Sequence, residues 1–440
     1  MTGRATGAPT LWCEHAWLPD GPAAAVAIEI SDGRISSVRP GAARAGTVLD
    51  GITVPGFVNA HSHAFHRALR GHPAGHATSF WSWRDDMYRV ADRLDPDSYR
   101  RLATAVYAEM ALAGYTSVTE FHYLHHGRGG HPYDDPNAMG HALVDAAAAA
   151  GIRLTLLDTC YLAGGIGEPL SPVQRRFADA HADAWAERLD PLLKIDDGDR
   201  VRLGAAVHSV RAVPEAELPI VAEWAAGGPL HVHLSEQTAE NEACLAAYGR
   251  TPTAVLDYAG VLGPDTVAVH ATHLTGDDVA RLAASGTRVC LCPTTERDLG
   301  DGIGPASQLH EAGVGLCLGS DSQAVVDPFE EARGAEMHER LAHRVRQRFS
   351  PAQLLSMATG STAGLAVGAP ADLVTVALDS VRTAGIAPVG VLHAAGAADV
   401  TDVLVGGRWV VRERVHRHVE RPAAALAAEI TALREATCRP

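Results

Sequence analysis

The stretch that ends in His61-Ser62-His63 carries the clearest chemical signal in this chain. Apolar residues from Thr53 to Val58 precede it and predict a buried strand. Side chains at alternate positions of a strand point to the same side, so His61 and His63 share one face at the end of this strand. Two such imidazoles can bind one metal ion. An isolated His-x-His pair is more often two exposed loop histidines, so further ligands must come from elsewhere in the chain.

Further residues of the metal-binding types follow later apolar stretches. His233 comes at the end of one such stretch and Asp321 directly follows another. His231 is on the same strand face as His233 but lies deeper in the strand, so we favour His233. On its own, Asp321 would be read as a helix N-cap. Neutral imidazoles with one carboxylate suit zinc and leave a position open for water. We therefore predict one divalent metal ion, with zinc expected, bound by His61, His63, His233 and Asp321.

A second metal ion is not expected. In some binuclear hydrolases a carboxylated lysine bridges two metals, but Lys194 is the only lysine in this chain. It lies in a polar loop that precedes a predicted strand, which is a poor position for a bridging ligand. The sequence therefore predicts a site with a single metal ion.

Hydrolysis also needs groups that move protons. Glu236 lies three residues after His233 and can take a proton from water and pass it to a leaving nitrogen. His270 and Asp321 can hold that water and help to deprotonate it. Taken singly, His270 would be a core histidine and Glu236 an acid favoured by the first turn of a helix. Together with the predicted ligands, we assign Glu236, His270 and Asp321 to catalysis.

Short apolar stretches alternate with amphipathic helical stretches through the middle of the chain. We expect eight strands, at residues 53–58, 116–121, 153–159, 202–207, 229–234, 266–269, 287–291 and 314–319. This alternation is typical of an α/β fold with a closed (β/α)8 TIM barrel, whose chemistry lies at the carboxyl ends of the strands. The candidate residues named above follow the ends of the predicted strands, as such a barrel requires.

Both ends of the chain have a different pattern, with short strands separated by turns. A hairpin is predicted around Ser31-Asp32-Gly33-Arg34, and further strands are predicted at residues 371–376 and 400–405. Because a hairpin alone cannot bury both faces, we expect both ends to form one small β-sandwich domain. This domain would comprise residues 1–54 and 366–440, including a C-terminal helix, and the catalytic barrel would comprise residues 55–365.

Composition narrows the classes of partner. The 440 residues are 47% hydrophobic and carry a formal net charge of −15, which argues against a surface for nucleic acid or anionic membrane. A small anionic substrate stays possible because a local group of arginines can reverse the sign of the charge. Seven cysteines lack a framework spacing, and the N-terminus shows no apolar signal segment. We expect a cytoplasmic protein that does not span a membrane.

The combined motifs resemble the mononuclear deaminase branch of the amidohydrolase superfamily, and within it the formimidoylglutamate deiminase family. The resemblance covers nearly the whole chain. It rests on His61-Ser62-His63-Ala64-Phe65-His66-Arg67-Ala68, Phe80-Trp81-Ser82-Trp83-Arg84, Glu120-Phe121-His122-Tyr123, His208-Ser209-Val210-Arg211, His231-Val232-His233-Leu234-Ser235-Glu236, Val269-His270-Ala271-Thr272-His273 and Gly319-Ser320-Asp321-Ser322.

The resemblance implies zinc-dependent hydrolysis of N-formimino-L-glutamate to N-formyl-L-glutamate and ammonia in histidine degradation, by a homodimer. A dicarboxylate is best bound by planar bidentate donors, which arginine supplies. Arg89 is the alternative to Arg84, and His66 stands where glutamine is common in the family. The implied substrate-binding residues are His66, Arg84, Tyr123, His208 and Arg211.

Two other functions stay open at this point. A related deaminase of the same branch would act on a nucleobase or another amidine, and its pocket would offer aromatic stacking and amide donors where this sequence offers arginines. A barrel without catalytic activity would serve as a scaffold, but such a protein is expected to lose metal ligands.

Overall fold

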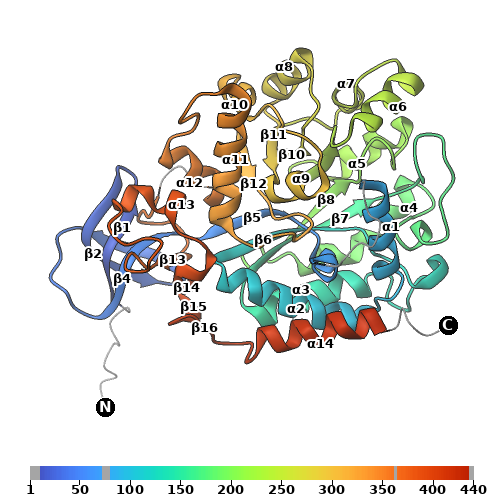
Figure 1. The fold of residues 1–440 in the computed structure, drawn as a ribbon. Helices are drawn as coiled ribbons and strands as arrows, with labels where there is room; N and C mark the ends of the chain where they lie inside the picture. Colours follow the sequence, from blue (N-terminus) through green and yellow to red (C-terminus); the bar gives the residue numbers. More distant parts are fainter. Residues whose placement is uncertain (1–9, 72–79, 361–363, 436–440) are drawn as a thin grey trace.

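The computed structural model describes residues 10–71, 80–360 and 364–435. The first residues of the chain, in which no signal segment was expected, lie outside the described residues. Two eight-stranded sheets organise the fold (Figure 1). One sheet is parallel throughout and follows chain order. Its strands are β5 (Phe57–Ser62), β6 (Tyr115–His122), β7 (Arg153–Cys160), β8 (Val201–Val207), β9 (Leu230–Leu234), β10 (Thr266–His270), β11 (Arg288–Leu291) and β12 (Leu316–Leu318). The predicted barrel is confirmed.

The barrel closes where β5 meets the end of β12. The backbone N–H of Asp321 donates to the carbonyl of His61 at 2.9 Å, and the N–H of His63 donates to the carbonyl of Asp321 at 3.1 Å. Gly319 permits this approach, because a Cβ at its position would lie 2.7 Å from the Cβ of His61. The seam thus places two predicted ligand segments side by side.

The prediction of one strand at residues 53–58 was wrong. This apolar run contains the end of β4 (Thr47–Pro55), which belongs to the second sheet, and the start of β5. The chain passes from one sheet to the other at Gly56, where an added Cβ would overlap the side chain of Thr116. Both strand segments are buried, so their hydrophobicity alone does not reveal the break.

The second sheet joins the two ends of the chain, as the sequence predicted. Its order is β16-β15-β14-β13-β4-β1-β2-β3. Leu11, Ile28, Leu373 and Leu404 share one buried cluster, so the two halves of the sheet pack against each other. The strands are β1 (Thr10–Leu18), β2 (Gly21–Ser31), β3 (Arg34–Arg39), β4, β13 (Leu373–Val376), β14 (Val400–Val405), β15 (Arg408–Arg412) and β16 (Val415–His416).

Helices cover the outside of the barrel and contribute to its mouth (Figure 1). Many begin at a residue suited to capping, such as Asp95 before α2, whose side chain accepts from the N–H of Ser98 at 2.8 Å. They are α1 (Phe80–Ala91), α2 (Pro96–Leu112), α3 (Ala138–Ala150), α4 (Ala182–Leu189), α5 (Leu218–Trp224), α6 (Thr238–Tyr248), α7 (Pro252–Tyr258), α8 (Gly276–Ser285), α9 (Pro293–Leu299), α10 (Ala306–Glu311), α11 (Pro328–His343), α12 (Pro351–Thr359), α13 (Val391–Ala394) and α14 (Pro422–Glu435).

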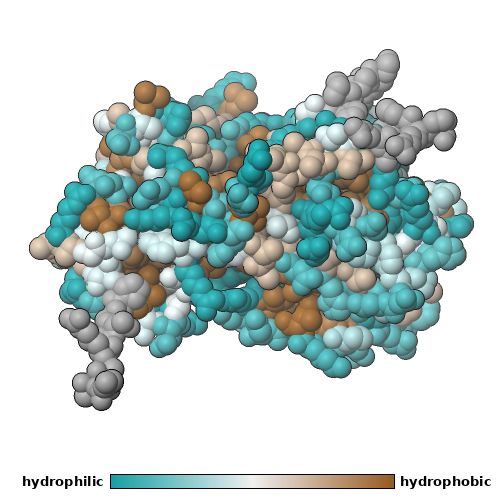
Figure 2. All heavy atoms as spheres, turned by 90° about the horizontal axis from the view of Figure 1, so that it is seen from below, coloured by the Kyte–Doolittle hydropathy of each residue, from teal (hydrophilic) through white to brown (hydrophobic). Residues whose placement is uncertain are grey.

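The C-terminal helix α14 packs on the barrel helix α2, so the end of the chain returns to the barrel (Figure 1). Seen from below, the molecular surface is largely hydrophilic, with apolar residues in separate small patches (Figure 2). Among the residues that the structure describes, no helix combines the length and apolarity needed to cross a bilayer.

Candidate active site

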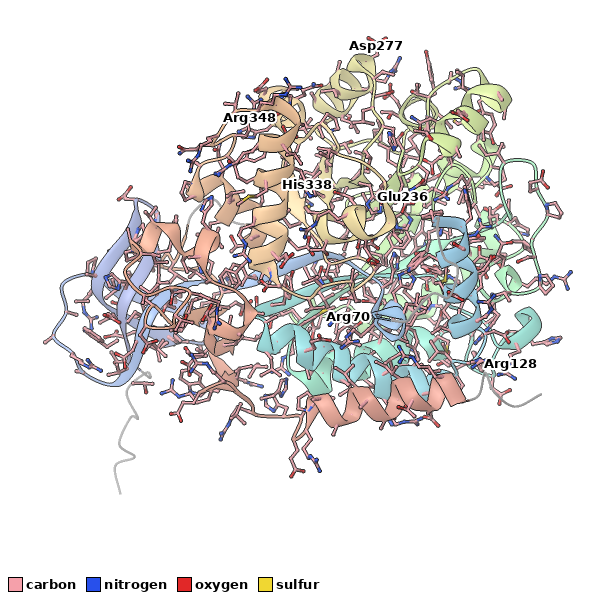
Figure 3. The ribbon with its side chains drawn as sticks, viewed as in Figure 1. Arg70, Arg128, Glu236, Asp277, His338 and Arg348 are labelled. Carbon is pink, nitrogen blue, oxygen red and sulfur yellow. The ribbon has the colours of Figure 1, made fainter. Side chains whose placement is uncertain are left out.

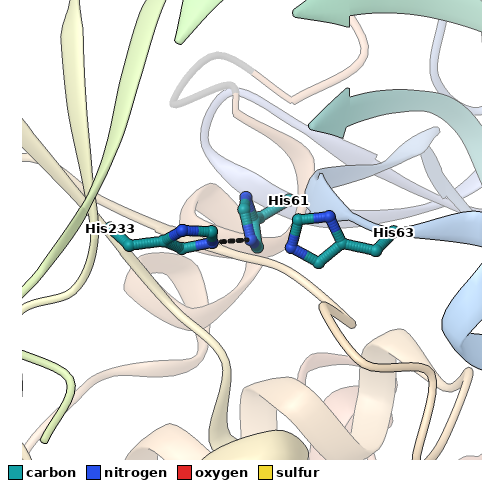
Figure 4. Close-up of side chains that lie close together, drawn as sticks. All are labelled: His61, His63 and His233. Atoms are coloured by element: carbon teal, nitrogen blue, oxygen red, sulfur yellow. Dashed lines mark hydrogen bonds between the residues drawn. The ribbon is translucent and has the colours of Figure 1, made fainter. Parts of the chain in front are cut away.

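Four predicted ligands meet at the carboxyl end of the barrel. His61 and His63 come from β5, His233 from β9, and Asp321 directly follows β12 and Gly319-Ser320. The Nε2 atoms of His61 and His233 are 3.1 Å apart (Figure 4). Oδ1 of Asp321 lies 3.4 Å from Nε2 of His61 and 3.3 Å from Nε2 of His63. The imidazole nitrogens of the three histidines lie within 4.8 Å of one another, which is the spacing that a shared metal ion requires.

The hydrogen bonds of two of these histidines fix which nitrogen faces the cluster. Nδ1 of His63 donates to the carbonyl of Phe121, and Nδ1 of His233 donates to the carbonyl of His208, both at 2.9 Å. Because a carbonyl can only accept, Nδ1 carries the proton and Nε2 keeps its lone pair for a ligand. These residues therefore fit a bound metal ion.

Burial keeps the histidines in the form that binds metal. It lowers the pKa of His61, and it lowers those of His63 and His233 well below the usual value. Burial by itself would raise the pKa of Asp321, but the hydrogen bond and charge interaction with His61 outweigh it, so that pKa lies well below the usual range. At neutral pH the cluster holds neutral imidazoles and an ionised carboxylate, the donor set that zinc prefers.

Several residues around the cluster have left-handed backbone conformations. Positive φ angles occur at Ser235 (49°), His270 (68°), Ala271 (51°), Asp321 (43°) and Gln323 (60°). Such conformations are unfavourable for residues other than glycine and concentrate at functional sites. They turn the ends of β9, β10 and the segment after β12 so that their side chains face a common centre.

A buried glutamate on the neighbouring strand supports the His-x-His segment. Glu120 of β6 accepts a hydrogen bond from the Ser62 hydroxyl at 2.7 Å and from the backbone N–H of Ala64 at 2.5 Å. Burial raises the pKa of Glu120 to about 8. Ser62, which points away from the metal ligands, is thus anchored on the opposite side of its strand.

The predicted catalytic residues adjoin the cluster. Nε2 of His270 lies 3.7 Å from Oε1 of Glu236 and 3.7 Å from Oδ2 of Asp321. On its other side, Nδ1 of His270 lies 3.5 Å from Oε1 of Glu296. Burial raises the pKa of Glu236, although the charges of His270 and Arg211 oppose that shift. A carboxyl with a raised pKa next to the ligands can both accept and donate a proton.

The two predicted arginines approach the same cavity from different elements. Arg211 follows β8 and lies 3.5 Å from Glu236 and 2.7 Å from Glu240. Arg84 of α1 stacks on the rings of Trp81 at 4.6 Å and Tyr88 at 5.5 Å. Arg89, the alternative to Arg84, is exposed and pairs with Asp86, and it does not line the cavity. The structure therefore favours Arg84 over Arg89.

The structure gathers the predicted site residues around one cavity of about 240 Å³. Glu236 lies in the interior, between α1 and α9 (Figure 3). Nε2 of His66 is 2.8 Å from the hydroxyl of Tyr123. His61 is fully buried beneath the cavity, whereas His231 is buried in β9 outside the ligand cluster. The predicted residues that line the cavity are His63, His66, Arg84, Tyr123, His208, Arg211, His233, Glu236, His270 and Asp321.

Sequence reasoning missed the aromatic part of the cavity and two acidic residues. We expected arginines in place of aromatic rings, but the cavity has both. The missed acids are Glu240, four residues after Glu236, and Glu296 at the start of α9. The rings lining the cavity that were not predicted are Phe80, Trp81, Trp83, Tyr88, Tyr161 and Phe177.

A second group of buried ligand-type side chains, His122, His125 and Asp158, lies outside this cavity. The carboxylate of Asp158 already accepts from the Arg188 guanidinium at 2.8 and 3.0 Å and from Nε1 of Trp185 at 3.1 Å. This carboxylate is therefore satisfied as a buried ion pair, and we assign no metal to the group.

The comparison with protein families agrees with this geometry. The family model described as the amidohydrolase family matches residues 52–410 of the chain. The chain belongs to the amidohydrolase family. The matched range includes every residue of the ligand cluster and of the cavity.

The chain is similar to known proteins over most of its length. The chain is 39% identical to formimidoylglutamate deiminase of Pseudomonas aeruginosa, covering 94% of this chain and 97% of the relative. It is 30% identical to 8-oxoguanine deaminase of the same species, with 82% of each chain covered. A solved amidohydrolase from Brucella melitensis superposes with a TM-score of 0.88 at 33% identity, covering 96% of this chain and 99% of that chain.

An adenosine deaminase from Xanthomonas campestris, solved with bound zinc, has a TM-score of 0.82 at 24% identity and covers 97% of this chain and 98% of its own. At this identity the likeness establishes the shared fold. The barrel with its attached sheet is therefore a fold that this chain shares with that adenosine deaminase.

Proposed function

We propose that this protein hydrolyses N-formimino-L-glutamate to N-formyl-L-glutamate and ammonia. One observation carries the proposal: two arginines, Arg84 and Arg211, line the same small cavity as the ligand cluster and Glu236. Two fixed cations suit a substrate with two carboxylates. The 39% identity to a formimidoylglutamate deiminase over 94% of this chain supports the same substrate.

We propose that zinc is the resident metal, held by His61, His63, His233 and Asp321. The convergence of neutral imidazoles and one carboxylate supports this assignment. A divalent cation held there supplies Lewis acidity, which lowers the pKa of water and makes hydroxide available at neutral pH.

The protein's own groups then position and protonate the substrate. Arg84 and Arg211 bind its carboxylates, with hydrogen bonds from Tyr123 and His208, and His66 orients the Tyr123 hydroxyl. The aromatic walls exclude water and narrow the cavity to about 240 Å³. This volume is below the usual range for drug-sized ligands and suits a small linear substrate.

Glu236 carries the proton in both steps. As the water oxygen bonds to the formimino carbon, the Glu236 carboxylate accepts a proton from that water. It then donates this proton to the terminal nitrogen of the cationic formimino group, and the carbon–nitrogen bond breaks to release ammonia. The remaining hydroxyl proton passes to the Glu236 carboxylate as the formyl carbonyl forms, and from there to the departing ammonia, which leaves as ammonium. His270 and Asp321 lie 3.7 Å apart. The His270 imidazole donates a hydrogen bond to the attacking water and the Asp321 carboxylate accepts one, so the two residues hold the water in line.

The assay that tests this proposal measures ammonia release by zinc-loaded protein. N-Formimino-L-glutamate should be turned over, whereas guanine, cytosine and adenosine should not. Glu236→Gln serves as the inactive control. Faster turnover of a nucleobase would favour the alternative of a nucleobase or amidine deaminase, which the aromatic walls of the cavity make chemically reasonable. A protein that binds no metal and turns over none of these compounds would fit the scaffold alternative.

We further propose that the enzyme acts as a cytoplasmic homodimer in histidine degradation. Met337 and Leu341, four residues apart on α11, are 46% and 75% exposed and offer apolar surface for a second subunit. The cysteines that the structure describes are free thiols, in keeping with a reducing compartment. Light scattering during gel filtration would measure the number of subunits, and a monomer would contradict the dimer.

A further inference from the structure

Glu240 contacts the same arginine as the catalytic glutamate. It lies in the first turn of α6, one helical turn after Glu236, and its side chain is only 1% exposed. Its Oε2 is 2.7 Å from Nε of Arg211, whereas Oε2 of Glu236 is 3.5 Å from a terminal nitrogen of the same guanidinium. The shorter of the two ion pairs is therefore the one with Glu240, whereas the long contact with Glu236 is a hydrogen bond that the terminal nitrogen donates.

The carboxylate of Glu240 is itself fixed. Its Oε1 accepts the backbone N–H of Ser235 at 2.8 Å, and Ser235 has a positive φ of 49°. This bond ties α6 to the turn that also carries Glu236. Because the guanidinium is a rigid plane, holding its Nε edge fixes where its terminal nitrogens point. Those nitrogens are the part of Arg211 left for the cavity, which both Arg211 and Glu240 line.

Glu240 also limits the pairing of Arg211 with Glu236. The carboxylates of Glu236 and Glu240 compete for the guanidinium of Arg211. In a buried site, a guanidinium with a single carboxylate neighbour pairs closely with it. Without the Glu240 charge, Arg211 would be free to shorten its 3.5 Å hydrogen bond to Glu236. That movement would withdraw the guanidinium from the substrate carboxylate that it binds.

We propose that Glu240 is a positioning residue that holds Arg211 in place to receive one substrate carboxylate. The proposal rests on the proposed function, because it assigns Arg211 to a carboxylate of the substrate. Glu240 acts through Arg211 and does not touch the reacting atoms, so its effect depends on the substrate having the carboxylate that Arg211 binds.

The test compares Glu240→Gln with wild type on three substrates: N-formimino-L-glutamate, N-formimino-4-aminobutyrate and N-formimino-L-2-aminobutyrate. Each of the last two lacks one carboxylate. Glutamine can still accept the Ser235 N–H but loses the charge facing Arg211. We expect kcat/KM for the diacid to fall roughly 10- to 100-fold, largely through KM, as for a buried charged group that loses its ion-pair partner. For the analogue without the carboxylate that Arg211 binds, kcat/KM should change less than about twofold.

Two further measurements make the result decisive. In an Arg211→Gln background, Glu240→Gln should have no additional effect on kcat/KM for the diacid, because the partner is gone. Glu242→Gln, an exposed change on the same helix, should match wild type. An equal loss on all three substrates, or the same loss in the Arg211→Gln background, would overturn the proposal. If Glu240→Gln does not fold, Glu240→Asp gives the same comparison, since it withdraws the charge by one methylene.

Binding of glutarate, measured by calorimetry, separates this proposal from the proposed function. Wild type should bind this dicarboxylate roughly 10-fold or more tightly than Glu240→Gln, whichever reaction the enzyme catalyses. If wild type does not turn over N-formimino-L-glutamate but the affinities differ in this way, the proposed function fails and the role of Glu240 stands. Equal affinities would remove the role of Glu240 while leaving the turnover result intact.

Discussion

The Nε2 atoms of His61 and His233 lie 3.1 Å apart, although their strands are not neighbours in the barrel. The His233 hydrogen bond to a backbone carbonyl leaves the lone pair of its Nε2 directed at His61. A lone pair facing a second buried imidazole is unfavourable unless a proton or a cation is shared between them. Both Nε2 atoms therefore face the centre of the cluster, as ligands of one shared cation would.

Replacing His233 should remove the metal. Loss of a residue that hydrogen-bonds to a metal ligand weakens metal binding roughly 10- to 100-fold. We expect His233→Gln, which removes a ligand itself, to weaken zinc binding by more than this and to abolish turnover. Zinc per chain after dialysis, measured by mass spectrometry, tests this. His231→Gln is the matched control on the same strand and should retain its zinc. Equal zinc content in both variants would remove His233 from the ligand set.

Replacing Glu236 should separate metal binding from proton transfer. Glu236→Gln keeps the shape of the side chain but cannot accept the proton, so kcat should fall about 10²–10⁴-fold while zinc content stays the same. Steady-state kinetics and metal analysis of one preparation provide both readings. Near-normal turnover would show that another group moves the proton.

The two arginines on α1 should differ in their effect on substrate binding. Arg84 lines the cavity, whereas Arg89 is exposed and paired with Asp86. Arg84→Gln should raise KM for N-formimino-L-glutamate roughly 10- to 100-fold through loss of a charged hydrogen bond, and Arg89→Gln should leave KM unchanged. Measured KM values for the two variants decide which arginine binds the substrate, and a larger effect at Arg89 would reverse the assignment.

An added methyl group at Gly319 should disturb the barrel seam. Its Cβ would lie 2.7 Å from Cβ of His61 and 2.8 Å from the backbone N and O of that residue. The segments must separate, so Gly319→Ala should lose about 1–3 kcal/mol of stability and bind zinc more weakly. Thermal unfolding with and without zinc measures both effects. Gly276→Ala, where an added Cβ meets nothing within 4 Å, is the control.

The buried carboxyl of Glu120 should make stability depend on pH. Burial raises its pKa to about 8 in the folded protein, compared with a usual value of 4.5. Between these two values the folded state keeps a proton that the unfolded state has lost. The contribution of Glu120 to the free energy of unfolding is therefore complete below pH 4.5 and is lost as the pH rises through about 8. Glu120→Gln cannot ionise, so the Tm of wild type minus that of the variant should fall steadily between pH 5 and pH 8. A constant difference would contradict the raised pKa.

The barrel, and the meeting of the candidate ligands at one end of it, were predictable because each depends on a local pattern. Apolar runs mark the strands, and residues such as His61, His233 and Asp321 directly follow or end those runs. The passage from β4 to β5 was missed because both strands are buried and Gly56 interrupts them for only one residue. Hydrophobicity alone cannot assign two successive apolar strands to different sheets.

Contacts between side chains on different loops left no local signal. Glu240 reads as an ordinary acid in the first turn of a helix, and only the fold brings it to Arg211. The pairing of Glu296 with His270 depends in the same way on how α9 follows β11. The ring-lined wall formed by α1 was likewise unpredictable, because apolar residues at helical spacing more often face a core than a cavity.

The bridge between β5 and the end of β12 joins the first and last strands of the barrel, and the metal ligands come from both sides of it. A chain still being synthesised can present His61 and His63 early, but it lacks Asp321 until the eighth strand has emerged. All four candidate ligands can therefore surround the ion only in the completed barrel. A truncated chain, or one with the wrong strand register, would bind the ion weakly, so bound metal indicates a completely assembled barrel. Removal of the ion should destabilise the protein first at the seam between the first and last strands.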